Sequence, residues 1–184
     1  MAQVDDARRE GLKRYYFLRA GVSVAWIAAA VTVGVASPIP AGVLLVAYPA
    51  WDALANALDA RANGGLKANA PQALNLAISV LVALAVLLAL RTDPSRVLTV
   101  FGLWAGFAGL LQLAAGVRRW RAVGAQWPMV LSGAQSALAG GFFVAQSLGA
   151  GPHPPTILTI APYAGFGAVY FLIAGVALML KGRK

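Results

Sequence analysis

The sequence contains no cysteine and only one histidine. Among its 184 residues, 6 are acidic and 15 are lysine or arginine. The absence of cysteine excludes disulfides, thiolate metal sites and thiol nucleophiles. A single histidine makes a metal site improbable, and no nucleophile elbow, phosphate-binding loop or zinc-protease helix occurs. The sequence therefore predicts a protein that is not an enzyme and that uses neither a metal nor a cofactor.

Charged residues are scarce along the whole chain. They make up 11% of it, whereas a soluble domain carries roughly a quarter. Hydrophobic residues make up 60%, and the mean hydropathy is +0.72. The apolar residues also occur in blocks of about 20, the length that crosses a bilayer as a helix. We expect a single-domain, all-α integral membrane protein in contact with the lipid bilayer.

Six apolar blocks are expected to be transmembrane helices. The expected spans are 15–36, 41–61, 72–90, 96–117, 127–148 and 156–180. Residues 1–14 are polar and of mixed charge, and we expect them to form an amphipathic N-terminal segment on the cytoplasmic surface. The transmembrane domain then covers residues 15–181, in three helical hairpins of about 15–63, 71–121 and 127–181.

The net charge of +9 does not indicate nucleic-acid binding, because the basic residues flank the apolar blocks and form no basic patch. With six spans, thirteen of the fifteen lysines and arginines fall on the side of the two termini. The other side receives Arg91 and Arg96. By the positive-inside rule both termini are expected in the cytoplasm of a bacterium, with the chain crossing the inner membrane several times.

Two short patterns recur three times along the chain, which suggests an internal repeat. The odd-numbered spans contain LRAGVS, LNLAIS and LSGAQS, which end at Ser23, Ser79 and Ser136. The even-numbered spans begin with Pro40, Pro94 or Pro154, followed three residues later by a β-branched residue and then by leucine. Such hairpins would pack around a pseudo-threefold axis. Small residues expected at close helix contacts are Gly102, Gly106, Gly109, Gly133, Gly140, Gly141, Gly165 and Gly167; their faces could also pair protomers into a homo-oligomer.

Three features carry a resemblance to a known family: the hairpin repeats, the basic cytoplasmic ends, and the stretch FGLWAGFAGLLQLAAGVRRWRAVGAQW followed by LSGAQSALAGG. They resemble the HdeD family of small bacterial inner-membrane proteins. The resemblance covers the chain from about Tyr15 to Leu180. It implies a role in acid or envelope stress tolerance and supplies no catalytic residues. The chain departs from the family pattern at Asp52, where a small residue is usual.

The second span carries a polar stripe. It consists of Tyr48, Asp52, Asn56, Asp59 and Asn63, which follow one another at helical spacing and so share one face. A carboxylate near the middle of a span must face protein or water. Asp52 is therefore interpreted either as a proton or ion site, with Tyr48 and Asn56 beside it, or as a structural latch bonded to Ser23, Ser79, Ser136 or a tryptophan N–H.

Further polar residues lie in other spans. Arg19 and Asp59 are expected at similar depth and are predicted to form a salt bridge. The neutral side chains are Asn75, Ser79, Gln112, Gln135 and Ser136; they could line a cavity or join helices. His153, in GPHPP, is expected to be exposed. Tyr15 and Tyr16 are expected in the aromatic belt.

Two functions follow from this sequence. The first is a non-enzymatic inner-membrane protein that supports stress tolerance. The second is a small transporter or channel for protons, ions or a small solute that uses the stripe around Asp52.

Overall fold

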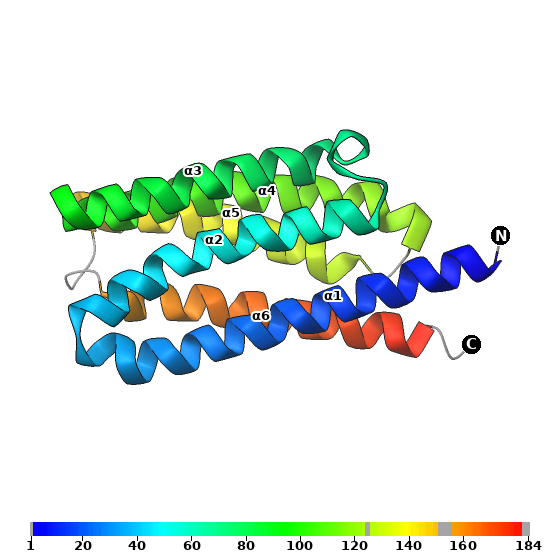
Figure 1. Cartoon of the computed structure of the whole chain (residues 1–184), viewed down its shortest axis with the longest axis horizontal. Coiled ribbons are helices and arrows are strands. Elements are labelled where there is room, and N and C mark those ends of the chain that lie inside the picture. The colour runs from blue at the N-terminus through cyan, green and yellow to red at the C-terminus, as the bar shows by residue number, and fades with distance from the viewer. Residues whose placement is uncertain (1, 124–125, 151–155, 182–184) are drawn as a thin grey trace.

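A computed structural model describes residues 2–123, 126–150 and 156–181. Six long helices run side by side, with both ends of the chain at the same end of the bundle (Figure 1). They are α1 (Ala2–Ala29), α2 (Pro38–Ala62), α3 (Ala70–Thr92), α4 (Val97–Val123), α5 (Trp127–Ala145) and α6 (Ile157–Lys181). Short π-helical turns, η1 (Ala30–Gly34) and η4 (Gln146–Ala150), extend α1 and α5, and 3₁₀ turns, η2 (Leu66–Ala68) and η3 (Pro94–Arg96), precede α3 and α4.

The outer surface of the bundle is apolar. In the described part of the chain, six helical segments are long and apolar enough to cross a membrane. Large hydrophobic side chains point outwards from several helices, among them Leu81 (65% exposed) and Leu138 (76% exposed), whereas Asp52 and Asp59 are buried. This arrangement is the reverse of a soluble bundle. The expected fold class is confirmed: this is an all-α polytopic membrane protein whose outer surface contacts lipid.

Proline and glycine residues mark the ends of α2, which begins three residues before the expected span. Ser37 is extended and precedes α2, whose first residue is Pro38, a position where the missing N–H of proline costs nothing. After α2 the chain turns through Gly64 and Gly65, whose φ angles of 92° and 86° favour glycine. Asp93 then accepts a hydrogen bond from the backbone N–H of Ser95 before α4.

The N-terminal segment is not separate from the first span. Residues 2–14 continue into it as one helix, α1, which extends to Ala29. No proline interrupts this stretch, and Glu10 pairs with Lys13 at 2.6 Å and with Arg14 at 3.4 Å, three and four residues on. The expected boundary at Tyr15 is therefore not a helix boundary, and the first segment suited to crossing a membrane begins at Arg9.

The closest helix pairs join neighbouring predicted hairpins. α2 packs on α3, α4 on α5, and α6 returns to α1. Within the predicted hairpins, α3 also packs closely on α4, whereas α1 and α2 touch less. The six helices thus form a closed ring around one axis. Descent of the three hairpins from one ancestor stays a prediction.

The tightest interface, between α4 and α5, depends on glycine. A Cβ added to Gly109 would lie 2.6 Å from the Gly133 carbonyl oxygen, and one added to Gly140 would lie 2.6 Å from the Gly102 carbonyl oxygen. The backbones therefore touch, as small-residue interfaces in membranes allow. The predicted contact role is confirmed at these four positions. Gly106 also lies at this contact, because a Cβ added to Gly140 would lie 2.5 Å from the Gly106 backbone nitrogen. The predicted role is wrong for Gly141 and Gly167, where an added Cβ would meet nothing within 4 Å, and Gly165 has only one distant neighbour.

Candidate functional site

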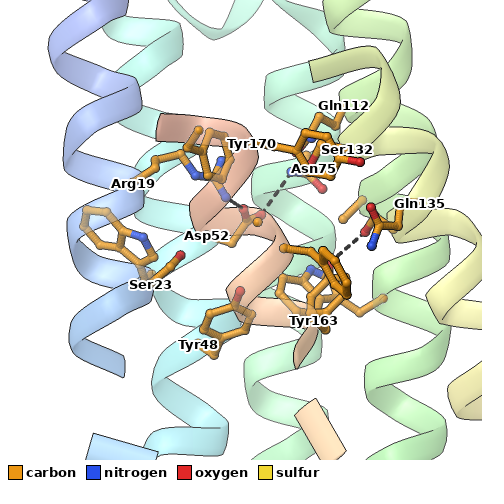
Figure 2. A pocket seen from close by; sticks show the side chains of 17 residues that line it. Arg19, Ser23, Tyr48, Asp52, Asn75, Gln112, Ser132, Gln135, Tyr163 and Tyr170 are labelled. Atoms are coloured by element: carbon orange, nitrogen blue, oxygen red, sulfur yellow. Dashed lines mark hydrogen bonds and ion pairs between the residues drawn. The ribbon is translucent and has the colours of Figure 1, made fainter. Parts of the chain in front are cut away.

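Asp52 is the centre of a hydrogen-bond network in the middle of the bundle (Figure 2). Its Oδ1 forms an ion pair with Arg19 Nη2 of α1. Its Oδ2 accepts hydrogen bonds from Asn75 Nδ2 at 3.0 Å and Ser79 Oγ at 2.9 Å, both on α3. Asn56 Nδ2, one turn along α2, donates to the same oxygen at 3.0 Å. One carboxylate therefore joins three helices, α1, α2 and α3.

The predicted salt bridge between Arg19 and Asp59 is wrong, because Arg19 pairs with Asp52. Counted from Ser37, Arg19 lies 18 residues back, while Asp52 and Asp59 lie 15 and 22 residues on. At 1.5 Å per residue, Arg19 thus lies at a depth between the two carboxylates, about one helical turn from each. Rotation of the helices decides the partner. Arg19 also donates to the Tyr15 hydroxyl at 3.0 Å and stacks over Phe171, with 4.4 Å between its guanidinium carbon and the ring centre.

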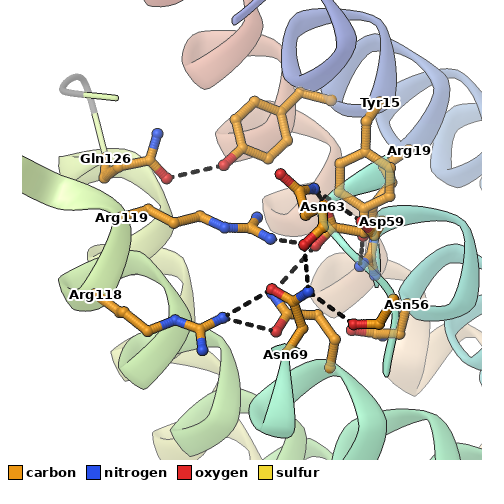
Figure 3. A network of polar contacts seen from close by, with 12 residues as sticks. Tyr15, Arg19, Asn56, Asp59, Asn63, Asn69, Arg118, Arg119 and Gln126 are labelled. Atoms are coloured by element: carbon orange, nitrogen blue, oxygen red, sulfur yellow. Dashed lines mark hydrogen bonds and ion pairs between the residues drawn. The ribbon is translucent and has the colours of Figure 1, made fainter. Parts of the chain in front are cut away.

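Asp59 belongs to a second network, nearer the chain ends (Figure 3). Arg119 Nη2 of α4 forms an ion pair with its Oδ2 at 2.6 Å, and Gln72 Nε2 donates to the same oxygen at 3.2 Å. Asn63 Nδ2 donates to its Oδ1 at 3.0 Å. Arg119 was predicted only as a membrane-flanking charge, yet its side chain is 14% exposed. This network joins α2, α3 and α4.

Other members of this network extend it across the end of the bundle. Arg118 donates to Asn69 Oδ1 at 3.2 Å and to Gln72 Oε1 at 3.1 Å. Tyr16, which was predicted in the aromatic belt, is 2% exposed and donates to Gln126 Oε1 at 2.9 Å. Tyr16 therefore packs inside the bundle. The sequence alone does not distinguish a tyrosine at the membrane interface from one that is buried inside the bundle.

Two cavities lie beside the two networks. The central cavity, beside Asp52, has a volume of about 50 Å³. The inner cavity, beside Asp59, has a volume of about 40 Å³. Both are lined by Arg19, Asn75, Gln112 and Phe171, so they are neighbours along the axis. Each volume leaves room for roughly three water molecules.

Two buried polar atoms in the shared wall have no hydrogen-bond partner among the described residues: Arg19 Nε and Asn75 Oδ1. Asn75 as a whole is only 7% exposed. A buried polar group without a partner costs about 1–3 kcal/mol. Arg19 and Asn75, which line both cavities, thus carry one unused donor and one unused acceptor.

Three aromatic rings from α2, α4 and α6 meet on the far side of the central cavity. The ring centres of Tyr48, Trp104 and Tyr163 lie 5.7 to 6.3 Å apart, edge to face. We call these residues the aromatic triad. Trp104 Nε1 donates to Ser79 Oγ at 2.9 Å, and the Tyr163 hydroxyl lies 2.7 Å from Ser136 Oγ.

The serines of the repeated sequence pattern therefore lie beside the aromatic triad. Ser79 and Ser136 bond to Trp104 and Tyr163, and Ser23 interacts with Tyr48. Each odd helix thus supplies a serine and each even helix a ring. This arrangement agrees with pseudo-threefold packing.

Beyond the triad, the end of the bundle away from the termini contains a wide pocket, which we call the vestibule, of about 800 Å³. Leu45, Leu98 and Ile160 line it, each one or two turns from a triad ring on the same helix. The vestibule, the triad, the central cavity and the inner cavity therefore follow one another along the bundle.

The predicted site residues lie together along this axis. Tyr48, Asp52, Arg19, Gln112 and Gln135 line the central cavity, and Asn56 and Asp59 line the inner one. Tyr48 packs against Trp26, and Gln112 donates to the Met129 carbonyl at 3.4 Å.

Ser79 and a tryptophan N–H had been named as possible latch partners of Asp52. Ser79 bonds to Asp52 directly, and the N–H of Trp104 reaches it through Ser79. The partners that sequence reasoning missed are Asn75 for Asp52, and Gln72 and Arg119 for Asp59. His153 lies outside the described residues.

Across residues 2–123, 126–150 and 156–181, no three acidic or histidine side chains are grouped so that they could hold a metal ion. Comparison of the chain with protein-family models, curated proteins and solved structures finds no match.

Proposed function

We propose that this polytopic membrane protein is a non-enzymatic transporter or channel, and that a small polar species crosses it along the bundle axis. The observation that carries the proposal is the line of cavities: vestibule, central cavity and inner cavity. A protein that needed Asp52 only as a latch could fill these spaces with side chains, because interiors are normally close-packed.

Two barriers interrupt the path in this conformation. The aromatic triad separates the vestibule from the central cavity, with ring centres no more than 6.3 Å apart. The ion pair of Arg119 with Asp59 stands at the inner cavity. Transport would require each barrier to open, and a salt bridge or a rotating ring can do so without unfolding a helix.

Asp52 has two roles in this proposal. Its ion pair with Arg19 and its three amide and hydroxyl donors hold α1, α2 and α3 in register, which is the latch role. Its place in the central cavity wall also lets it contact a passing solute. The structural and transport interpretations of Asp52 are therefore compatible.

The cellular role that we propose with it is support of acid or envelope stress tolerance, in a bacterial inner membrane with both termini in the cytoplasm. The resemblance to the HdeD family suggests the role, and the excess of basic residues at the termini supports the orientation. Acid survival of a deletion strain carrying the wild-type or the Asp52→Asn gene would test the role.

The test of transport is flux through the purified full-length protein in liposomes, under an imposed gradient of protons, of alkali ions or of a small neutral solute. The Asp52→Asn variant should change the flux, because it removes a charge from the central cavity. Asp93→Asn is the matched control, since it makes the same chemical change at a carboxylate that is exposed at the start of α4. No flux of any species in the wild type would contradict the proposal and leave Asp52 as a latch.

A further inference from the structure

The charges that line the two cavities cancel. Four charged side chains reach the cavity walls, in the described part of the chain: Arg19, Asp52, Asp59 and Arg119. They form two ion pairs, Arg19 with Asp52 and Arg119 with Asp59. An ion in either cavity would have no opposite charge to neutralise it unless one of these pairs opened, and an unneutralised ion is strongly disfavoured away from water.

The unpaired atoms in the shared wall specify the occupant more closely. Arg19 Nε can only donate a hydrogen bond, and Asn75 Oδ1 can only accept one. Both atoms are buried and have no partner among the described residues. A ligand that satisfies both must accept from one and donate to the other, which water, amides and alcohols do.

From this geometry we infer that the central and inner cavities form a binding site for small neutral molecules that both donate and accept hydrogen bonds, with Arg19 Nε and Asn75 Oδ1 as its anchoring groups. The occupant is water or a solute of comparable size, since the cavities measure about 50 and 40 Å³. The inference rests on the proposed transport function and names its substrate class. It predicts that neutral molecules, and not protons or ions, are the main transported species.

Two glycines allow a matched test. Gly167 lines the central cavity, and an added Cβ there would meet nothing within 4 Å. Gly141 is equally open to an added Cβ but faces outwards on α5. Gly167→Leu should therefore reduce the cavity volume, whereas Gly141→Leu adds the same side chain at a lipid-facing position.

The experiment is stopped-flow light scattering on liposomes that contain the purified protein, with an osmotic step for water and with inward gradients of urea and glycerol. Proton and potassium flux are measured on the same liposomes. We expect permeation of water or of these neutral solutes above that of protein-free liposomes, with proton and potassium flux at background. Gly167→Leu should reduce permeation to that of protein-free liposomes, and Gly141→Leu should leave it unchanged.

The set of species that permeate separates the neutral-ligand inference from the proposed transport function. Water permeation alone would make the site a water site, and permeation of urea or glycerol would extend it to solutes. Proton or potassium flux with neutral permeation at background would overturn the neutral-ligand inference and keep the transport function. No flux of any species would overturn both. If Gly167→Leu does not fold, as judged by its elution and melting in detergent, Gly167→Ala provides the same test with a smaller decrease in permeation.

Discussion

In the half of the bundle near the chain ends, which we call the termini-side half, ion pairs and hydrogen bonds join buried side chains of α1 to α4, beside an apolar cluster of α1, α5 and α6. In the opposite half, from the aromatic triad to the vestibule, buried side chains are joined mainly by apolar packing. The core of this far half contains Trp26, Val86, Leu98, Phe101 and Ile160. In water, apolar packing would be expected to dominate both halves. In a membrane the outside is already apolar, so polar contacts can specify which helices meet.

Breaking the ion pair between Arg19 and Asp52, in the termini-side half, should have the largest effect on stability. Arg19→Met or Asp52→Leu alone leaves an unpaired charge inside the bundle, and we expect each to lower the free energy of unfolding by about 3–5 kcal/mol. The double variant should lose less than the sum of the two single losses, because it leaves neither charge behind. The measurement is unfolding of the purified protein by titration with SDS in mixed micelles.

The control for this cycle is Arg14→Met. Arg14 is 80% exposed and lies 3.4 Å from Glu10, so its loss should change the free energy of unfolding by about 0–1 kcal/mol. Additive effects of the Arg19 and Asp52 substitutions would show that their contact does not stabilise the termini-side half.

The α4–α5 interface tests packing in the far half. Gly140→Ala places a methyl group 2.5 Å from the Gly106 backbone nitrogen, and this overpacking should lower the free energy of unfolding by about 1–3 kcal/mol. Gly141→Ala, one residue on, meets nothing within 4 Å and should leave it unchanged. Equal free energies of unfolding for the two variants would show that close backbone contact is not needed between α4 and α5.

Trp104 connects the two halves, since its ring belongs to the triad and its N–H bonds to Ser79, a partner of Asp52. Trp104→Phe keeps a ring and removes the hydrogen bond. We expect a loss of about 1 kcal/mol, the usual size of a hydrogen bond between membrane helices. In the Ser79→Ala background the same substitution should lose less. An unchanged loss there would place the effect in ring packing instead of in the link between the halves.

The helix count could be predicted from the sequence, whereas the pairing inside the termini-side half could not. Apolar blocks of fixed length, ended by prolines and glycines, specify six helices because a bilayer leaves few alternatives. The inward face of α2 was also predictable, since Asp52 in mid-span excludes a lipid-facing position.

Partner choice depends on helix rotation and offset, which the sequence does not report. Arg19 lies about one helical turn in depth from each carboxylate of α2, and a side chain as long as that of arginine reaches either. Arg119 occurs in a basic cluster at a helix end, which is the pattern of a membrane-flanking charge. Only the packing of α3 against both α2 and α4 brings Arg119 to Asp59.

The smallest effect is expected at the exposed turn before α4. Hydrogen bonds from Ser95 and then Arg96 hold the pKa of Asp93 below its ordinary value. Because the folded state favours the carboxylate, the stabilisation is present at pH above the ordinary pKa of 3.8 and is lost as the pH falls through the lowered one. Asp93→Asn removes this pH-dependent term, so amide exchange at Ser95 should be faster than in the wild type near neutral pH. The difference should disappear in acid. A carboxyl carbon of Asp93 that titrates at the ordinary pKa, measured by NMR in micelles, would contradict this capping role.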